Sequence, residues 1–281
     1  MLRETYPKTF VVLSILFALF TLFLYAPTLT ITVLSFQGPE GGLVFPMRGW
    51  SLHWFAEVFQ KQSIGDIHGS FGRSIKLALL VMLLTVVISF LAGLAFRQRF
   101  RGATLLFYVA IASLIMPSVV VSLGIGSLLE VLGIERFWWN AGLGAHLTWT
   151  LPFGLLIMFA VFNRFDKRLE EAARDQGASG VQTVRHVILP IVLPSLIGVG
   201  LFGFTLSYDE LARSSQVMGA LNTLPLELQA MQTNATTPVI YALGTLTTAL
   251  SLLVIGVSLG AVLLLQRRRA RAGSDAGKGM V

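Results

Sequence analysis

The chain has 281 residues, of which 54% are hydrophobic and only 12% are charged. Soluble domains carry about a quarter charged residues, so this composition excludes an ordinary water-soluble protein and indicates an integral membrane protein. The absence of cysteine excludes a disulfide framework, a cysteine-ligated metal and a thiol nucleophile. The formal net charge is +7, but the positive residues lie in short runs beside apolar segments, which is typical of contacts with anionic membrane lipid and not with nucleic acid.

Six apolar segments approach or exceed the roughly 20 residues that an α-helix needs to cross a bilayer. In chain order they are residues 9–34, 74–96, 105–132, 144–162, 191–208 and 239–265. The sequence therefore predicts an all-α integral membrane protein with six transmembrane helices. The fourth and fifth segments are short, which predicts either local thinning of the bilayer or helices that continue beyond these bounds.

Lysine and arginine set the predicted orientation. If the N-terminus is cytoplasmic, fifteen of these residues lie in cytoplasmic segments and five lie outside. Because membrane proteins concentrate Lys and Arg in cytoplasmic loops, both termini and the loop 169–190 are predicted to be cytoplasmic. We expect an N-terminal anchor and extracytoplasmic segment over 1–69, a membrane core over 70–265 and a basic cytoplasmic tail over 266–281, without regular structure after Arg269.

Small and cyclic residues punctuate the predicted spans, and one outer segment is rich in aromatic residues. The stretch WSLHWFAEVF, within 1–69, predicts an amphipathic helix at the membrane surface. Three prolines lie inside apolar spans and predict kinks, because each removes a backbone donor: Pro27, Pro117 and Pro152. Three glycines of the fifth span predict close helix contact: Gly198, Gly200 and Gly203.

The loop 169–190, LEEAARDQGASGVQTVRHVILP, is polar although apolar segments lie on both sides. Its good helix formers predict a short helix over 169–176, ended by Gly177, and a second one over 180–187. The spacing resembles the EAA loop of ABC-importer permeases: EAA, three residues, Gly, nine residues, Ile, one residue and Leu-Pro. The matching positions are Glu171, Ala172, Ala173, Gly177, Val187, Leu189 and Pro190, with Val187 where Ile is usual.

This resemblance implies an ABC type I importer permease fold and a coupling loop that docks in a groove of an ATP-hydrolysing subunit. It also implies a complex of two permease subunits, two ATP-binding subunits and an extracytoplasmic solute-binding protein in the bacterial cytoplasmic (inner) membrane. A P-loop of the form G-x-x-x-x-G-K-[ST] is absent from the sequence. We therefore expect no enzymatic activity and no cofactor in this chain, with ATP hydrolysis by a partner.

Longer passages, among them FTLSYDELARSSQV and TLPLELQAM, resemble the spermidine/putrescine-type branch, and specifically the second six-span subunit of its heterodimer. The resemblance implies alternating access for a small solute, with a polyamine or related organic cation as the first candidate. Permeases for opine or amino-acid derivatives, phosphonates, thiamine or ferric iron remain alternatives. A secondary transporter is a further one, although the spans are nearly free of charge at their centres, and an intramembrane enzyme ranks last.

The candidate solute path begins at the outer end of the fifth span, where Asp209 and Glu210 follow Tyr208. Carboxylates at a membrane edge usually face water and pair with amines through charge-assisted hydrogen bonds. The resemblance associates this acidic pair with recognition of a polycation; a solvated loop start or a helix cap is the structural alternative. Ser118, where the branch commonly has an acidic residue, completes the candidates. The four histidines have no metal-ligand spacing, so we expect no metal site.

Overall fold

The computed structural model describes residues 8–60, 65–98, 100–234 and 237–278. Within these ranges the regular structure is helical, apart from one isolated bridge between Gln37 and Trp50. The chain divides into two compact units, one of residues 1–65 and 230–250 and one of residues 66–229 and 251–281. The first seven residues, the last three and the side chains from 268 onward lie outside what the structure describes.

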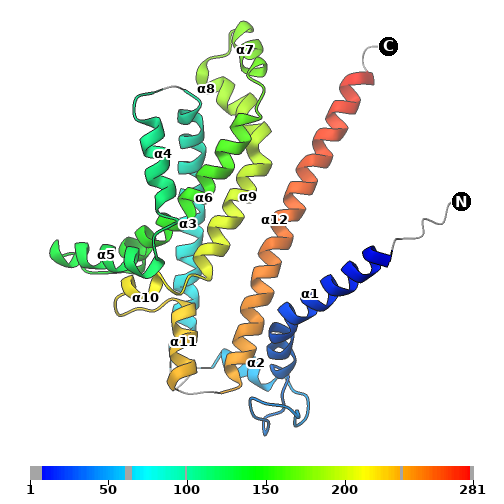
Figure 1. Cartoon of the computed structure of the whole chain (residues 1–281), viewed down its shortest axis with the longest axis vertical. Coiled ribbons are helices and arrows are strands. Elements are labelled where there is room, and N and C mark those ends of the chain that lie inside the picture. The colour runs from blue at the N-terminus through cyan, green and yellow to red at the C-terminus, as the bar shows by residue number, and fades with distance from the viewer. Residues whose placement is uncertain (1–7, 61–64, 99, 235–236, 279–281) are drawn as a thin grey trace, which may run out of the picture. The chain divides into compact units, whose positions relative to one another are not determined.

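The larger unit is built on three long apolar helices, α3 (Ile67–Phe96), α6 (Leu143–Asn163) and α9 (Leu189–Tyr208), which pack against one another (Figure 1). One buried apolar cluster lies toward the loop 169–190, and its members are Met158, Phe162, Ile188, Val192, Leu196 and Val199. A second buried cluster lies toward the opposite end, and its members are Leu77, Val81, Ala141, Ala145, Val217 and Met218. The three helices therefore form a bundle that has a buried apolar cluster toward each of its ends.

Two of the three predicted contact glycines explain how closely α9 approaches α3. A Cβ at Gly203 would lie 3.2 Å from the Cα of Met82, and one at Gly200 would lie 3.3 Å from the side chain of Val86. Gly198 faces open space, with nothing within 4 Å of the corresponding Cβ position. The prediction of close contact is therefore confirmed for Gly200 and Gly203 and is wrong for Gly198.

Among the residues that the structure describes, five helices are long and apolar enough to cross a membrane. The third predicted span, 105–132, is wrong as a continuous helix: it consists of α4 (Ala103–Ala112) and α5 (Ser118–Val131), and α5 turns away from the direction of α4 (Figure 1). Pro117 explains the break, because it has no backbone N–H and disfavours helical geometry in the residue before it. The hydroxyl of Ser113 fixes the break by donating to the carbonyl of Thr148 in α6, at 2.8 Å.

The fourth and fifth predicted spans continue beyond their sequence bounds. This confirms the prediction of longer helices, which was the alternative to local thinning of the bilayer. The π-helical turn η1 (Trp138–Gly142) precedes α6, which gives an apolar helix over Trp138–Asn163. The short helix α8 (Gly180–Thr183) and the π-helical turn η2 (Val184–Ile188) precede α9, which gives a helix over Gly180–Tyr208. The loop 169–190 is thus partly an extension of the transmembrane helix α9.

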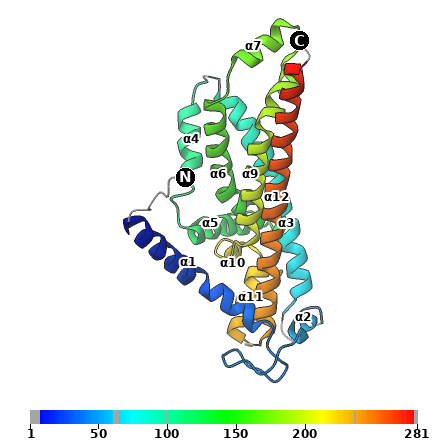
Figure 2. The ribbon, with the colours of Figure 1, turned by 90° about the vertical axis from the view of Figure 1, so that its right-hand side faces the viewer.

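Figure 2 shows the bundle from the side, with α7 (Arg168–Asp175) beyond one end of α6 and α9. The short helix α10 (Ser214–Val217) follows the other end of α9 and contacts α5, α6 and η1. The helix α11 (Leu224–Asn234) comes next in the chain. The N-terminus of α3 is held nearby: the Ser74 hydroxyl accepts from the Leu224 amide at 2.8 Å.

The smaller unit contains α1 (Lys8–Leu34), α2 (His53–Val58) and the first part of α12 (Val239–Lys278). The helix α2 confirms the predicted helix within WSLHWFAEVF, although it spans only six residues. The buried side chain of Gln37 organises the loop between α1 and α2 by accepting from the Arg48 amide at 2.7 Å and donating to the Gly42 carbonyl at 3.0 Å. The expectation of an irregular tail after Arg269 is wrong, because α12 continues to Lys278.

Candidate functional site

The first half of the loop 169–190 folds as the predicted short helix, here α7. The second half is helical as predicted but is not a separate short helix, because it is the start of the continuous helix Gly180–Tyr208. Glu170 and Glu171 lie in the first turn of α7, and Arg174 lies in its last turn, an arrangement that complements the helix dipole. Glu171 and Ala172 are exposed, and Ala173 is half-buried. The loop therefore presents the charged side chain of Glu171 beside two alanines. These small side chains leave room for the backbone of another protein to approach.

Gly177 ends α7 in the left-handed region, with φ +85°. Its amide donates to the Arg174 carbonyl at 2.8 Å, and the Ala178 amide donates to the Ala173 carbonyl at 3.0 Å. These two bonds form a Schellman motif, in which a residue without a Cβ is strongly favoured at the left-handed position. The glycine of the EAA spacing is thus explained by backbone geometry.

A capping box begins α8 immediately after this turn. The Ser179 amide donates to the Gln182 side chain at 2.7 Å, and the Gln182 amide donates to the Ser179 hydroxyl at 3.3 Å. The remaining predicted coupling residues lie in η2 and at the start of α9. Val187 and Leu189 are half-buried, and Pro190 is exposed. Pro190 removes one backbone donor directly after the π-helical turn η2, where the regular helical hydrogen-bond pattern is already altered.

An open depression of about 410 Å³ lies on one side of the loop, and it is lined by Ala173, Gln176, Gly177, Ala178, Gln182 and His186. Val181, in the same loop, exposes 79% of its area although it is apolar. The structure thus brings Ala173 and Gly177 of the EAA spacing to one depression, whereas Val187, Leu189 and Pro190 do not line it.

The second candidate region lies at the opposite end of α9, where the predicted path residues have different surroundings. Tyr208 is the last residue of α9 and is 2% exposed, with its ring stacked on Phe204 at 5.8 Å between centroids. Asp209 follows as the C-cap and is exposed. Partial burial of its carboxyl group raises the pKa of Asp209 above its usual value, and no ion pair involves it among the described residues.

Glu210, the next residue, is held within the chain. Its carboxylate accepts from the backbone amide of Arg213 at 2.9 Å and pairs with the guanidinium of Arg213 at 3.1 Å. Arg213 is only 3% exposed, and its guanidinium lies 4.5 Å above the ring of Trp149 in α6. The charge of Glu210 is therefore balanced locally, while that of Asp209 is not.

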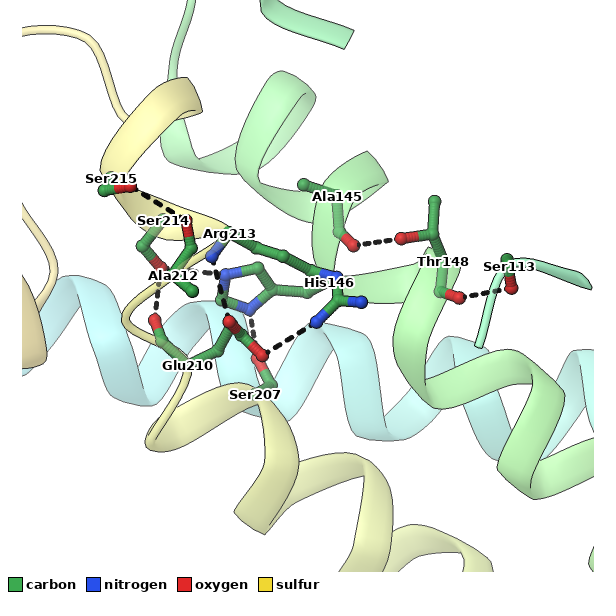
Figure 3. A network of polar contacts seen from close by, with 10 residues as sticks. All are labelled: Ser113, Ala145, His146, Thr148, Ser207, Glu210, Ala212, Arg213, Ser214 and Ser215. Atoms are coloured by element: carbon green, nitrogen blue, oxygen red, sulfur yellow. Dashed lines mark hydrogen bonds and ion pairs between the residues drawn. The ribbon is translucent and has the colours of Figure 1, made fainter. Parts of the chain in front are cut away.

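A chain of hydrogen bonds through His146 fixes the same segment to α6 (Figure 3). The Ser214 hydroxyl donates to the Glu210 carbonyl at 2.5 Å, so it accepts from the N–H at Nε2 of His146 at 3.0 Å. The other ring nitrogen, Nδ1, then accepts from the Ser207 hydroxyl at 2.8 Å. The fully buried His146 thus ties the end of α9 and the start of α10 to one helix.

Ser118, the remaining path candidate, is the first residue of α5 and is half-buried. Within the described part of the chain, no hydrogen bond joins it to Tyr208, Asp209 or Glu210. The described residues also contain no cluster of three or more His, Asp or Glu side chains that could hold a metal ion.

Three residues of this network, the buried Arg213 and His146 and the half-buried Trp149, were not indicated by the sequence. Arg213 appeared there only as an outer positive charge, although its spacing of three from Glu210 was a usable signal for a local pair. His146 was considered only among the four histidines without metal-ligand spacing, and Trp149 was not assigned to any site. Their contacts join residues about sixty positions apart, which no local pattern of a single sequence encodes.

Comparison with known proteins identifies the family. A family model described as the inner membrane component of binding-protein-dependent transport systems matches residues 85–272. The chain belongs to this family. This result confirms the resemblance found in the sequence and places the permease among multi-pass proteins of the bacterial inner membrane.

The permease is similar to the spermidine/putrescine transport system permease protein PotC of Haemophilus influenzae, with 32% identity over 240 residues that cover 84% of this chain and 90% of that protein. It is also similar to the putrescine transport system permease protein PotI of Escherichia coli, with 30% identity over 233 residues that cover 80% of this chain and 81% of that protein. Both similarities extend over most of the chain.

A solved structure shares the fold of the permease. It is that of a bacterial alginate ABC transporter in complex with an alginate pentasaccharide-bound periplasmic protein, of which one chain aligns with a TM-score of 0.63 at 14% identity, over 94% of each chain. The predicted ABC importer permease fold is therefore confirmed.

Proposed function

We propose that the permease is one transmembrane subunit of an ATP-driven importer for a polyamine or a closely related organic cation. The names of the similar proteins support this solute, since PotC belongs to a spermidine/putrescine system and PotI to a putrescine system. Two ATP-binding subunits, a second, non-identical permease subunit and an extracytoplasmic solute-binding protein complete the proposed complex. The periplasmic protein bound to the structurally similar alginate transporter supports the last of these partners.

The loop formed by α7 and α8 is the proposed docking element for the ATP-binding subunit. Ala173 and the turn at Gly177 line a depression of about 410 Å³. Glu171 and Ala172 are exposed on α7, and Val181 leaves an apolar surface to be covered. Alternating access then follows from closure of the ATP-binding subunits. Moving a two-state equilibrium from 1:99 to 99:1 requires about 5.5 kcal/mol of differential binding, which nucleotide binding and hydrolysis supply.

Asp209 is the observation that carries the proposed solute. It is an exposed carboxylate at the C-terminus of α9, where the helix dipole disfavours a negative charge, and no cation of the described chain pairs with it. A position that is unfavourable for the isolated chain becomes favourable when an ammonium group of the solute approaches. Glu210 is the weaker candidate, because Arg213 already balances its charge.

Uptake of radiolabelled putrescine tests this proposal in cells that lack the chromosomal permease gene and express either the wild type or a variant. Asp209→Asn removes the charge and keeps the shape. We expect its KM for uptake to rise by roughly 10- to 100-fold, the equivalent of losing one hydrogen bond to a charged group. Glu130→Gln, at an exposed carboxylate of α5, is the matched control and leaves the KM unchanged.

Two results would contradict the proposed solute. One is uptake of putrescine and spermidine that does not depend on the wild-type permease gene. The other is equal loss of uptake in Asp209→Asn and Glu130→Gln, which would indicate a nonspecific effect of outer charge. Competition by unlabelled amino-acid derivatives, phosphonate, thiamine or ferric iron, with no competition by polyamines, would instead assign one of the alternative solutes.

A further inference from the structure

The two halves of the loop 169–190 are joined to the membrane bundle in different ways. From Gly180 onward, α8, η2 and α9 form one uninterrupted helix that ends at Tyr208. On the other side, α7 is joined to α6 by the non-helical residues 164–167. A continuous helix transmits displacement along its axis, whereas a short irregular segment bends. The covalent link between α7 and the bundle is therefore the more compliant of the two.

A side-chain link bridges this compliant segment. Arg97, the C-cap of α3, forms an ion pair with Glu170 in the first turn of α7. The two side chains are only 12% and 14% exposed. Arg97 and Glu170 lie at a depression of about 450 Å³ that faces the inner side of α7. The pair thus connects the end of one core helix directly to the EAA helix.

The guanidinium of Arg97 is also held from the side of α6. It lies 5.1 Å from the ring centroids of both Phe162, near the end of α6, and Phe165, in the irregular segment. Phe162 belongs to the buried cluster between α6 and α9 and packs closely against Gly93 of α3. Because packed interiors are nearly incompressible, Arg97 occupies a fixed position relative to α3 and α6.

We infer that Arg97 and Glu170 form a positioning pair that transmits movement of α7 to α3 and α6. Movement of α8 passes separately to α9 through the continuous helix. This inference rests on the proposed docking of the loop on an ATP-binding subunit. Arginine suits the task because its planar guanidinium stacks on the two rings while its N–H groups bind a carboxylate. Without the pair, α7 follows the ATP-binding subunit while α3 and α6 lag behind.

The test uses the full complex in proteoliposomes, with both permease subunits, the ATP-binding subunits and the solute-binding protein. Putrescine transport and ATP hydrolysis are measured together per assembled complex, which gives the number of solutes moved per ATP. Glu170→Gln is the mild variant, since it keeps the side-chain shape, and Arg97→Gln removes the partner. Lys167→Gln is the control, because Lys167 lines the same depression and forms no ion pair within the described residues.

We expect transport per ATP to fall by about tenfold in Glu170→Gln and in Arg97→Gln, with normal assembly and little change in Lys167→Gln. The double variant should lose no more than either single one, because the two residues act through each other. Unchanged transport per ATP in Glu170→Gln, or losses that multiply in the double variant, would overturn the inference. A wild-type complex whose ATP hydrolysis does not respond to loaded solute-binding protein would instead overturn the proposed function and, with it, this inference.

Discussion

Glu210 and Asp209 are adjacent carboxylates, and the structure predicts opposite consequences for their loss. Glu210→Gln leaves the guanidinium of Arg213 buried without its counter-charge. The glutamine oxygen can still accept from the Arg213 amide, which lies 2.9 Å from the Glu210 carboxylate. Its NH2 group then faces the guanidinium, where two donors oppose each other. Glu210→Gln should therefore destabilise the permease, while Asp209→Asn should not destabilise it and should impair uptake.

The expected magnitude for Glu210→Gln follows from the burial of the pair. Breaking a buried ion pair by removing one partner costs about 3–5 kcal/mol. The lower end applies here because Arg213 keeps its contact with Trp149, at 4.5 Å, and one hydrogen bond survives. We expect the free energy of unfolding to fall by about 3 kcal/mol, roughly a hundredfold in the equilibrium constant.

Titration of the purified permease with SDS in mixed micelles measures this change, with tryptophan fluorescence as the signal, since Trp149 lies against the pair. The double variant Glu210→Gln with Arg213→Met is the matched control: replacing both partners of a buried pair by uncharged groups is often nearly neutral, so it should unfold within about 1 kcal/mol of the wild type. A Glu210→Gln variant as stable as the wild type, or a double variant less stable than the single one, would refute the buried-pair reasoning.

Two further predictions concern the packing and capping of α3. Gly203→Ala should reduce the free energy of unfolding by about 1–2 kcal/mol because the new methyl group meets Met82 of α3. Gly198→Ala, whose new methyl group faces open space, should be neutral or slightly stabilising. Equal effects of the two variants in the SDS titration would contradict the packing of α9 on α3. The hydrogen bond from the Gly69 amide, followed by the bond to Arg73, holds the pKa of Asp66 below its usual value of 3.8. The contribution of Asp66 to stability is therefore present above about pH 4 and is lost as the pH falls through the pKa of the folded state. Asp66→Asn should make the free energy of unfolding less dependent on pH in this acidic range. An unchanged pH dependence would contradict the role of the cap.

Features encoded over a few neighbouring residues were predictable from the sequence. The apolar runs located the long helices, and the turn chemistry of the loop 169–190 placed the helix break at Gly177, where the structure has a left-handed residue. Both predictions depend on local properties, namely hydropathy over about 20 residues and the backbone preference of one glycine. Pro117 was recognisable as a disturbance, but a lone proline in an apolar run does not distinguish a kink from the full break between α4 and α5.

Features that depend on distant contacts were not predictable. The sequence offered Asp209 and Glu210 as equal candidates, and only the pair between Glu210 and the buried Arg213 separates them. Likewise, nothing near His146 in the sequence indicates that its ring joins Ser207 to Ser214. Arg97 looked like one more positive charge in a cytoplasmic loop, whereas its contacts with Glu170, Phe162 and Phe165 arise from the packing of three helices.

Site-directed cross-linking tests the docking of the loop on an ATP-binding subunit most directly. The permease contains no cysteine, so Ala173→Cys introduces a single reactive thiol at the depression beside Gly177. In the assembled complex, this thiol should form a disulfide with a cysteine introduced into the groove of the ATP-binding subunit, and the yield should change when ATP is added. Labelling of the thiol by a membrane-impermeant maleimide from outside intact cells, with no cross-link to the ATP-binding subunit, would contradict both the orientation and the coupling role of the loop.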